Sequence, residues 1–232
     1  MVPDLIKSSS SQSGISPRWW QISHAVSLIL ATFLELGMKL HWLVVLTGGI
    51  SFVILIVSGY TKGEWGRKFG IPNSVTLFRL LGVLGLGVLG TYLLWYIVIL
   101  FCIFLLITDG VDGWIAKRLH QTTLFGDHFD RETDSFFTLI LSLLLIHSNL
   151  VGTWIVIAGL LRYITVIVNH LVPHTPSEYR WGAARVIYVI AIGLMLIPFF
   201  PIPGMATPAA VAAVILLLTS FSRDYQWMFS HR

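Results

Sequence analysis

Charged residues and cysteine are scarce in this sequence. Asp, Glu, Lys and Arg together make up 11% of the 232 residues, whereas 56% are hydrophobic, and the mean hydropathy is +0.81. Such a composition is typical of a chain built from membrane-spanning segments, and we expect no separate soluble domain beside them. The only cysteine, Cys102, has no second cysteine with which to form an intramolecular disulfide, so the sequence does not indicate an oxidising compartment. We expect Cys102 to be buried in a helix.

Long apolar runs dominate the rest of the chain. Each run is roughly 20 residues long, enough to cross the ~30 Å hydrocarbon core of a bilayer as a helix. The predicted spans are 22–38, 42–59, 74–94, 95–116, 126–147, 150–170, 183–200 and 207–222. The sequence therefore predicts an all-α integral membrane protein with eight transmembrane helices.

A charged connector at 60–73, with three Gly and one Pro, interrupts the series of predicted helices. It divides the chain into an N-terminal transmembrane pair at 22–60 and a six-helix block at 61–232, which ends in a short tail. The Ser-rich residues 1–21 are typical of a disordered tail. We found no internal repeat.

The basic residues are distributed asymmetrically about the predicted spans. With eight spans, one side of the membrane carries Lys7, Arg18, Lys62, Arg67, Lys68, Lys117, Arg118, Arg180, Arg185, Arg223 and Arg232. The opposite side carries only Lys39. The basic side is cytoplasmic by the positive-inside rule, so we expect both termini in the cytoplasm. The net charge of +4 therefore reflects membrane topology and contact with lipid, and we expect no nucleic-acid partner.

The acidic residues are concentrated in one short stretch. Six of the 11 Asp and Glu lie within 108–134, and they are Asp109, Asp112, Asp127, Asp130, Glu132 and Asp134. Asp109 and Asp112 share one face near the end of the fourth predicted helix. Asp127, Asp130 and Asp134, at spacing i, i+3, i+7, share one face where the fifth helix begins. Because a short connector joins these cytoplasmic helix ends, the two carboxylate faces can meet.

Carboxylates that meet inside a membrane protein repel one another unless they are protonated or bind a cation. With only oxygen ligands available, we expect Mg²⁺, Mn²⁺ or Ca²⁺ rather than zinc. Asp127 has a simpler explanation than cation binding, because an acidic side chain is favourable at a helix N-terminus. Glu132 falls off the acidic face, and we expect it to pair with Arg131, Lys117 or Arg118.

The spacing of this stretch resembles the signature of the CDP-alcohol phosphotransferase family, D-x2-D-G-x2-A-R-x8-G-x3-D-x3-D. The matching residues are Asp109, Asp112, Gly113, Ala116, Gly126, Asp130 and Asp134. The signature Arg is replaced by Lys117, which lacks the planar fork of a guanidinium. Either Lys117 acts as a point charge, or the neighbouring Arg118 takes its role.

The resemblance covers 72 to about 222, the six-helix catalytic core of the family, and "PNSVTLFR" at 72–79 is similar to the start of its first helix. It implies transfer of a phosphatidyl or phosphoalkyl group from a CDP-linked donor, such as CDP-diacylglycerol, to an alcohol, with release of CMP. The acceptor stays open among glycerol 3-phosphate, inositol or its phosphate, serine and others, and CDP-choline-type donors also occur. It also implies a homodimer.

The same resemblance implies the roles of the site residues. Two divalent cations, Mg²⁺ or Mn²⁺, are held by Asp109, Asp112, Asp130 and Asp134, and Asp134 also takes the proton of the acceptor hydroxyl. The residues that contact the nucleotide are expected to be Gly113, Ala116, Lys117, Gly126, Asn73 and Thr76.

Four arginines near the same face are candidates for binding a phosphate or the acceptor: Arg79, Arg118, Arg162 and Arg185. Three of the polar candidates have a structural alternative. Asn73 is placed to cap a helix, Arg162 to pair with an Asp of the cluster, and Arg185 to extend toward the membrane interface.

Two other functions are compatible with intramembrane acids. A metal-ion or solute transporter would use them along an ion pathway, but acids at one membrane face and halves without a repeat argue against this. A catalytically inactive member of the family is the other alternative, although all four signature Asp are present.

Overall fold

The computed structural model describes residues 17–63, 69–118, 123–171 and 183–230, apart from the side chains of 17–18, 111–118 and 224–230. These residues form eight α-helices and three short 3-10 turns, with no strand among them. The helices are α1 (Pro17–Met38), α2 (Leu43–Thr61), α3 (Ile71–Leu89), α4 (Trp95–Arg118), α5 (Leu124–His147), α6 (Val156–Leu171), α7 (Ala184–Leu196) and α8 (Ala206–Ser230). The expected all-α membrane fold with eight helices is confirmed. Residues 1–16 of the predicted disordered tail lie outside the described residues. For 17–21 the prediction is wrong, because these residues form the start of α1.

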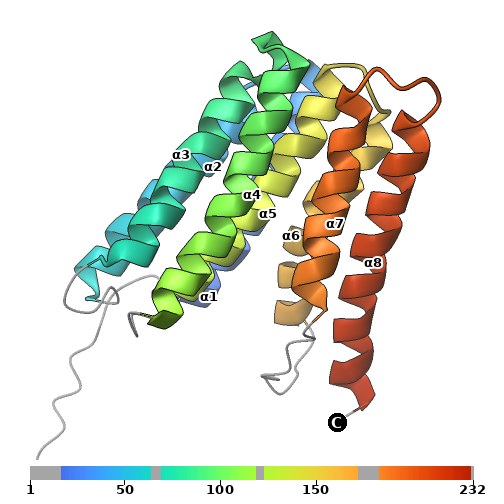
Figure 1. The fold of residues 1–232 in the computed structure, drawn as a ribbon. Helices are drawn as coiled ribbons and strands as arrows, with labels where there is room; N and C mark the ends of the chain where they lie inside the picture. Colours follow the sequence, from blue (N-terminus) through green and yellow to red (C-terminus); the bar gives the residue numbers. More distant parts are fainter. Residues whose placement is uncertain (1–16, 64–68, 119–122, 172–182, 231–232) are drawn as a thin grey trace, which may run out of the picture.

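The helices lie side by side as a bundle, and the start of α1 and the end of α8 are at the same end of it (Figure 1). Among the described residues, five helices are long and apolar enough to cross a membrane: α1, α2, α3, α6 and α8. Helices α4 and α7 contain shorter apolar stretches. The chain is therefore a multi-pass membrane protein.

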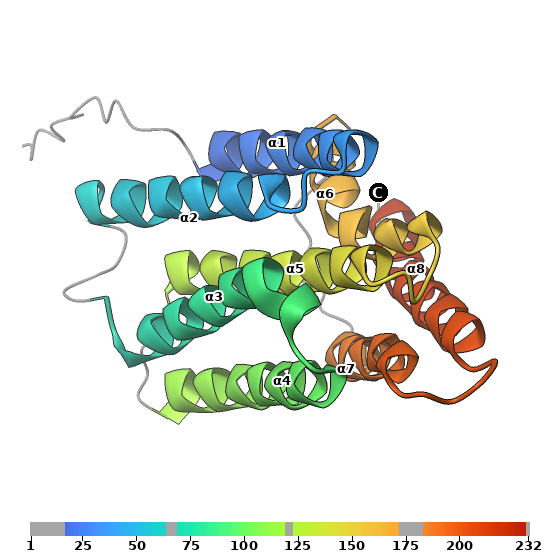
Figure 2. The same cartoon turned by 90° about the horizontal axis from the view of Figure 1, so that it is seen from above.

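Helix α5 is the central element of the bundle (Figure 2). Every residue from 136 to 145 is buried, on all sides of the helix. A helix that is apolar all round is stable only when neighbours surround it, and α5 packs mainly against α3 and α6. The first turns of α5, where the acidic residues lie, are thereby held at a defined depth in the bundle.

Local sequence determines where α5 and α3 begin, and both helices contribute side chains to the candidate active site described below. The Thr123 hydroxyl accepts a hydrogen bond from the Gly126 N–H at 3.0 Å and caps α5. Helix α3 follows Gly70, whose φ of 78° lies in the left-handed region, and has Pro72 in its first turn, where no N–H is needed.

Helices α5 and α6 approach closely because one residue between them lacks a side chain. A Cβ on Gly159 would lie 2.6 Å from the Cα of Leu139, closer than non-bonded carbons can approach. The N-terminal helices α1 and α2 pack against each other, and α1 also packs against α6, next to this contact. The Trp20 indole donates to the Ser51 carbonyl at 3.0 Å, and His24 Nδ1 lies 2.7 Å from the Ser51 hydroxyl.

Two further buried residues are Cys102 and Glu35. Cys102 is buried in α4, as expected. Glu35, near the opposite end of the bundle, is 1% exposed. Its carboxylate accepts a hydrogen bond from the Val44 N–H at 2.7 Å, so it satisfies a backbone donor in the first turn of α2.

Candidate active site

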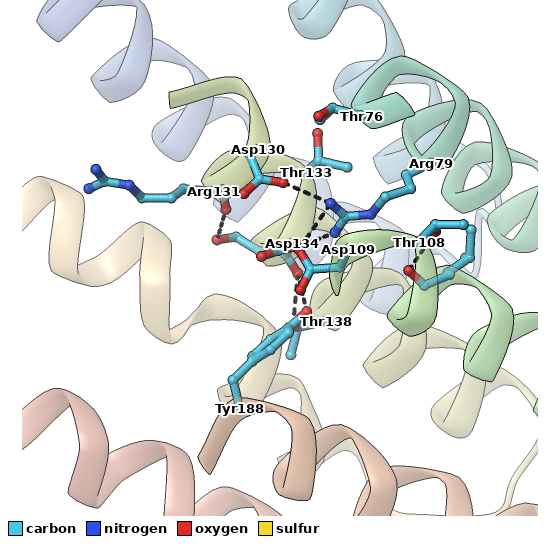
Figure 3. Close-up of polar contacts among 12 residues, drawn as sticks. Thr76, Arg79, Thr108, Asp109, Asp130, Arg131, Thr133, Asp134, Thr138 and Tyr188 are labelled. Atoms are coloured by element: carbon cyan, nitrogen blue, oxygen red, sulfur yellow. Dashed lines mark hydrogen bonds and ion pairs between the residues drawn. The ribbon is translucent and has the colours of Figure 1, made fainter. Parts of the chain in front are cut away.

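Three carboxylates converge between α4 and α5 (Figure 3). Asp109 lies on α4, and Asp130 and Asp134 lie one turn apart on α5. One ligand oxygen from each lies within 4.8 Å of the others. Asp109 is buried, whereas Asp130 and Asp134 are partly exposed. The expected meeting of the two acidic faces is thus observed for these three residues.

The Arg79 side chain extends from α3 into this group (Figure 3). Its Nη1 lies 2.7 Å from Asp130 Oδ1 and 3.1 Å from Asp109 Oδ1, and its Nη2 donates to Asp134 Oδ1. The side chain is 4% exposed. A guanidinium presents several donors in one plane, so it can bind several carboxylates at once and offset their mutual repulsion.

Helix α7 contributes two further side chains to the site. Arg185 Nη2 lies 3.2 Å from Asp109 Oδ2 and 3.1 Å from its carbonyl oxygen. The Tyr188 hydroxyl donates to the Asp134 carbonyl at 3.1 Å. Sequence reasoning missed Tyr188. The one available signal was its position three residues after Arg185, which places both on the same face of a helix.

Asn73 and Thr76 lie in the first turns of α3, and both are buried. The Asn73 amide donates to the Phe69 carbonyl at 2.6 Å, and the Thr76 hydroxyl donates to the Pro72 carbonyl at 3.2 Å. The expected cap role of Asn73 is wrong, because Asn73 is inside the helix and Gly70 occupies the cap position. A Cβ on Gly126 would lie 2.6 Å from Asn73 Oδ1, so this signature glycine lets α3 and α5 approach.

The acids and arginines outside the cluster pair differently from expectation. Glu132 is buried and binds Arg162 of α6 at 3.0 Å, not Arg131, Lys117 or Arg118. Two residues along a helix correspond to more than half a turn, so Glu132 faces away from Asp130 and Asp134. For the same reason the expected pairing of Arg162 with an Asp of the cluster is wrong.

Arg131 pairs instead with Asp127 one turn earlier, at the exposed start of α5. Asp127 lies in the first turn of α5, as expected for an acid that stabilises a helix N-terminus. The predictions for Asp112, Gly113, Ala116, Lys117 and Arg118 concern side chains outside the described part of the chain.

The chemistry of the cluster fits a divalent cation. All three donors are carboxylate oxygens, which suit hard cations such as Mg²⁺. Asp109 Oδ1 is buried and has no hydrogen-bond donor among the described residues, although Arg79 Nη1 lies 3.1 Å from it. A buried anionic oxygen in that situation is stabilised by a bound cation.

Comparison with known proteins identifies relatives of this sequence. It is 34% identical over 106 residues to a CDP-diacylglycerol–glycerol-3-phosphate 3-phosphatidyltransferase of Wigglesworthia glossinidia brevipalpis, covering 44% of this chain and 57% of the relative. A protein of the same name from Pectobacterium atrosepticum is 34% identical over 92 residues, covering 38% of this chain and 50% of the relative. The chain thus spans about half the length of the curated relatives it matches.

No solved structure matches the chain. The sequence model of the CDP-alcohol phosphatidyltransferase family matches residues 69–221, a region that runs from just before α3 into α8 and contains the whole carboxylate cluster. Helices α1 and α2 lie outside the match. The chain belongs to the CDP-alcohol phosphatidyltransferase family.

Proposed function

We propose that this protein transfers a phosphatidyl group from CDP-diacylglycerol to an alcohol and releases CMP, as a step of phospholipid biosynthesis. The observation that carries the proposal is the convergence of Asp109, Asp130 and Asp134 in a chain that belongs to this family. The names of both curated relatives support CDP-diacylglycerol as the donor and glycerol 3-phosphate as the first acceptor to test. Inositol, inositol phosphate and serine are the other candidates.

Asp109, Asp112, Asp130 and Asp134 would hold two divalent cations, Mg²⁺ or Mn²⁺. Bound cations supply charge stabilisation for the diphosphate and for the leaving CMP. The Asp134 carboxylate takes the proton of the acceptor hydroxyl. The hydroxyl oxygen then forms a bond to the phosphorus that carries the lipid, and the bond from that phosphorus to the bridging oxygen of the diphosphate breaks. The electron pair of that bond leaves with CMP.

Other residues position the reactants in this proposal. Arg185 lies beside Asp109 with a half-exposed side chain, 56% accessible, and so can reach a phosphate of the donor or acceptor. Tyr188 donates to the Asp134 carbonyl and restrains the backbone that carries the base. Asn73, Thr76 and Gly126 lie where α3 meets the start of α5 and form one wall for the nucleotide, with Gly113, Ala116 and Lys117 as the remaining contacts expected from the family signature.

The test is CMP release by the purified protein in detergent, with radiolabelled CDP-diacylglycerol, Mg²⁺ or Mn²⁺ and the panel of alcohols. We expect release to require the metal, and Asp134→Asn to lower the rate about a hundredfold or more, as loss of a general base does. Asp127→Asn is the matched control, since it makes the same change on the same helix. Its side chain is 39% exposed and is paired with Arg131 outside the cluster.

Equal rates for the two Asn variants would contradict the role of Asp134. If the wild type neither binds CDP donors nor releases CMP with any of them, the reaction class itself is wrong. Metal-dependent transport in vesicles would then support the transporter alternative.

A further inference from the structure

The position of Arg79 has a consequence for cation binding. Its two terminal nitrogens contact one oxygen each of Asp109, Asp130 and Asp134. Among the described residues, these same three carboxylates form the group that could hold a metal ion. One guanidinium therefore already lies against one oxygen of each carboxylate that would hold a divalent cation.

A cation and this guanidinium compete for physical reasons. Mg²⁺ binds carboxylate oxygens at about 2.0–2.1 Å and demands near-octahedral geometry. Each coordinating oxygen must therefore point a lone pair at the cation. Charge-assisted hydrogen bonds from a guanidinium direct the same lone pairs toward nitrogen. The two positive charges also repel across a few ångströms of a site where Arg79 is 4% exposed and water screens little.

We propose that Arg79 is a built-in counter-ion that competes with the divalent cation for the three carboxylates and thereby sets the cation concentration at which the enzyme becomes active. The inference rests on the proposed function, because it assumes that the cluster binds a catalytic cation. Without a cation, Arg79 holds the three carboxylates close together. When a cation binds, the guanidinium gives up part of its contacts with Asp109, Asp130 and Asp134.

This role differs from that of Arg185, the other arginine at the site. Arg185 contacts Asp109 alone, and its side chain is 56% exposed. It can turn into solvent when a cation arrives, at little cost in desolvation. Arg79 reaches all three carboxylates from a buried position on α3, so its contacts are the ones that a cation must break.

The test measures Mn²⁺ binding to the full-length protein in detergent, from the electron paramagnetic resonance signal of free Mn²⁺, with no substrate present. Because removing a positive charge beside a bound cation strengthens binding, we expect Arg79→Gln to lower the Kd about tenfold or more. Arg131→Gln is the matched control. It makes the same change on α5, where Arg131 is 42% exposed and paired with Asp127, and it should leave the Kd within about twofold of wild type.

A second experiment tests the competition directly and does not depend on the Arg79→Gln variant. In Arg79→Ala, added methylguanidinium should raise the apparent Kd for Mn²⁺ competitively, whereas the wild type should not respond. Should neither variant fold, Arg79→Lys keeps the charge but lacks the planar fork. It is expected to bind Mn²⁺ more tightly than wild type.

The outcomes separate this inference from the proposed function. If Asp134→Asn loses Mn²⁺ binding but Arg79→Gln and Arg79→Lys bind it no more tightly than wild type, the metal site stands and the competition is overturned. If neither the wild type nor Arg79→Gln binds Mn²⁺, the competition is overturned. The proposed function is overturned as well only if the protein shows no metal-dependent CMP release. A lower Kd in Arg79→Gln, with CMP release at lower Mn²⁺ concentration, supports both.

Discussion

Single side chains on α5 belong to two separate polar groups. Asp130 and Asp134 face Arg79 of α3 and Asp109 of α4, whereas Glu132 faces Arg162 of α6. The acid of the second group is more deeply buried than Asp130 and Asp134, since the Glu132 side chain is 1% exposed. This pair joins α5 to α6, next to the N-terminal helix α1, whereas the first group contains the proposed metal ligands.

The Glu132–Arg162 pair gives a prediction about stability. Removing one partner of a buried ion pair leaves an uncompensated charge, so Arg162→Met should destabilise the protein by about 3–5 kcal/mol. Replacing both partners with apolar residues, as in Arg162→Met with Glu132→Leu, should restore most of that loss. Thermal unfolding of both variants in the same detergent is the measurement. A single variant that keeps its Tm but loses affinity for a phosphate-bearing substrate would instead assign Arg162 to binding.

At the scale of the element, the contact of α5 with α6 sets the position of α5, the helix that carries Asp130 and Asp134. Residues 136–145 of α5 are buried on every side, and α6 reaches them closely at Gly159. The cap of α5 by Thr123 determines where the helix starts, and so the depth of Asp130 and Asp134 in the bundle. A shift of α5 along its axis would therefore change the geometry of the carboxylate cluster.

Substitution of Gly159 tests this element. A Cβ there meets the backbone of Leu139 at 2.6 Å, and backbone cannot move aside as a side chain can. We expect Gly159→Ala to destabilise the protein by about 1–3 kcal/mol, the usual cost of overpacking. Gly193→Ala in α7 is the control, since its Cβ would meet nothing within 4 Å. An unchanged Tm for Gly159→Ala would contradict the close packing of α5 against α6.

The whole molecule places the site at one end of a membrane bundle. The described ends of the chain, the start of α1 and the end of α8, lie at a common end (Figure 1). The start of α5 and the end of α4, which flank the carboxylate cluster, lie at that end as well. In the proposed reaction, the water-soluble product CMP would leave most readily from a site near a membrane surface.

Cysteine labelling tests the orientation of the bundle. Cys102 is buried, so a new cysteine is the only one that a bulky reagent should reach among the described residues. By the positive-inside rule, a membrane-impermeant maleimide added to intact cells should label Ile202→Cys. It should label Thr61→Cys only after lysis. Ile202 is 51% exposed in the turn between α7 and α8, and Thr61 ends α2. The reverse pattern would place the site on the outer side.

Sequence alone predicted the helices well and the site in part. Length and apolarity placed eight helices, since a backbone in lipid must satisfy its own hydrogen bonds. Helical spacing placed Asp109 on one face, and Asp130 with Asp134 on another, because that relation is local. The partner of Glu132 was missed, since Arg162 is 30 residues away on α6, and only packing decides which helix faces which side of α5.

The character of the protein as a helical membrane protein of this family was thus determined by its sequence, through apolar length and the spacing of its acids. Tertiary structure alone decided which charges meet. Arg79 is 51 residues from Asp130 in the chain, and Tyr188 is 54 from Asp134. Neither contact follows from any periodicity, because each requires two helices far apart in the chain to pack at a particular depth and rotation. That is a property of the assembled bundle.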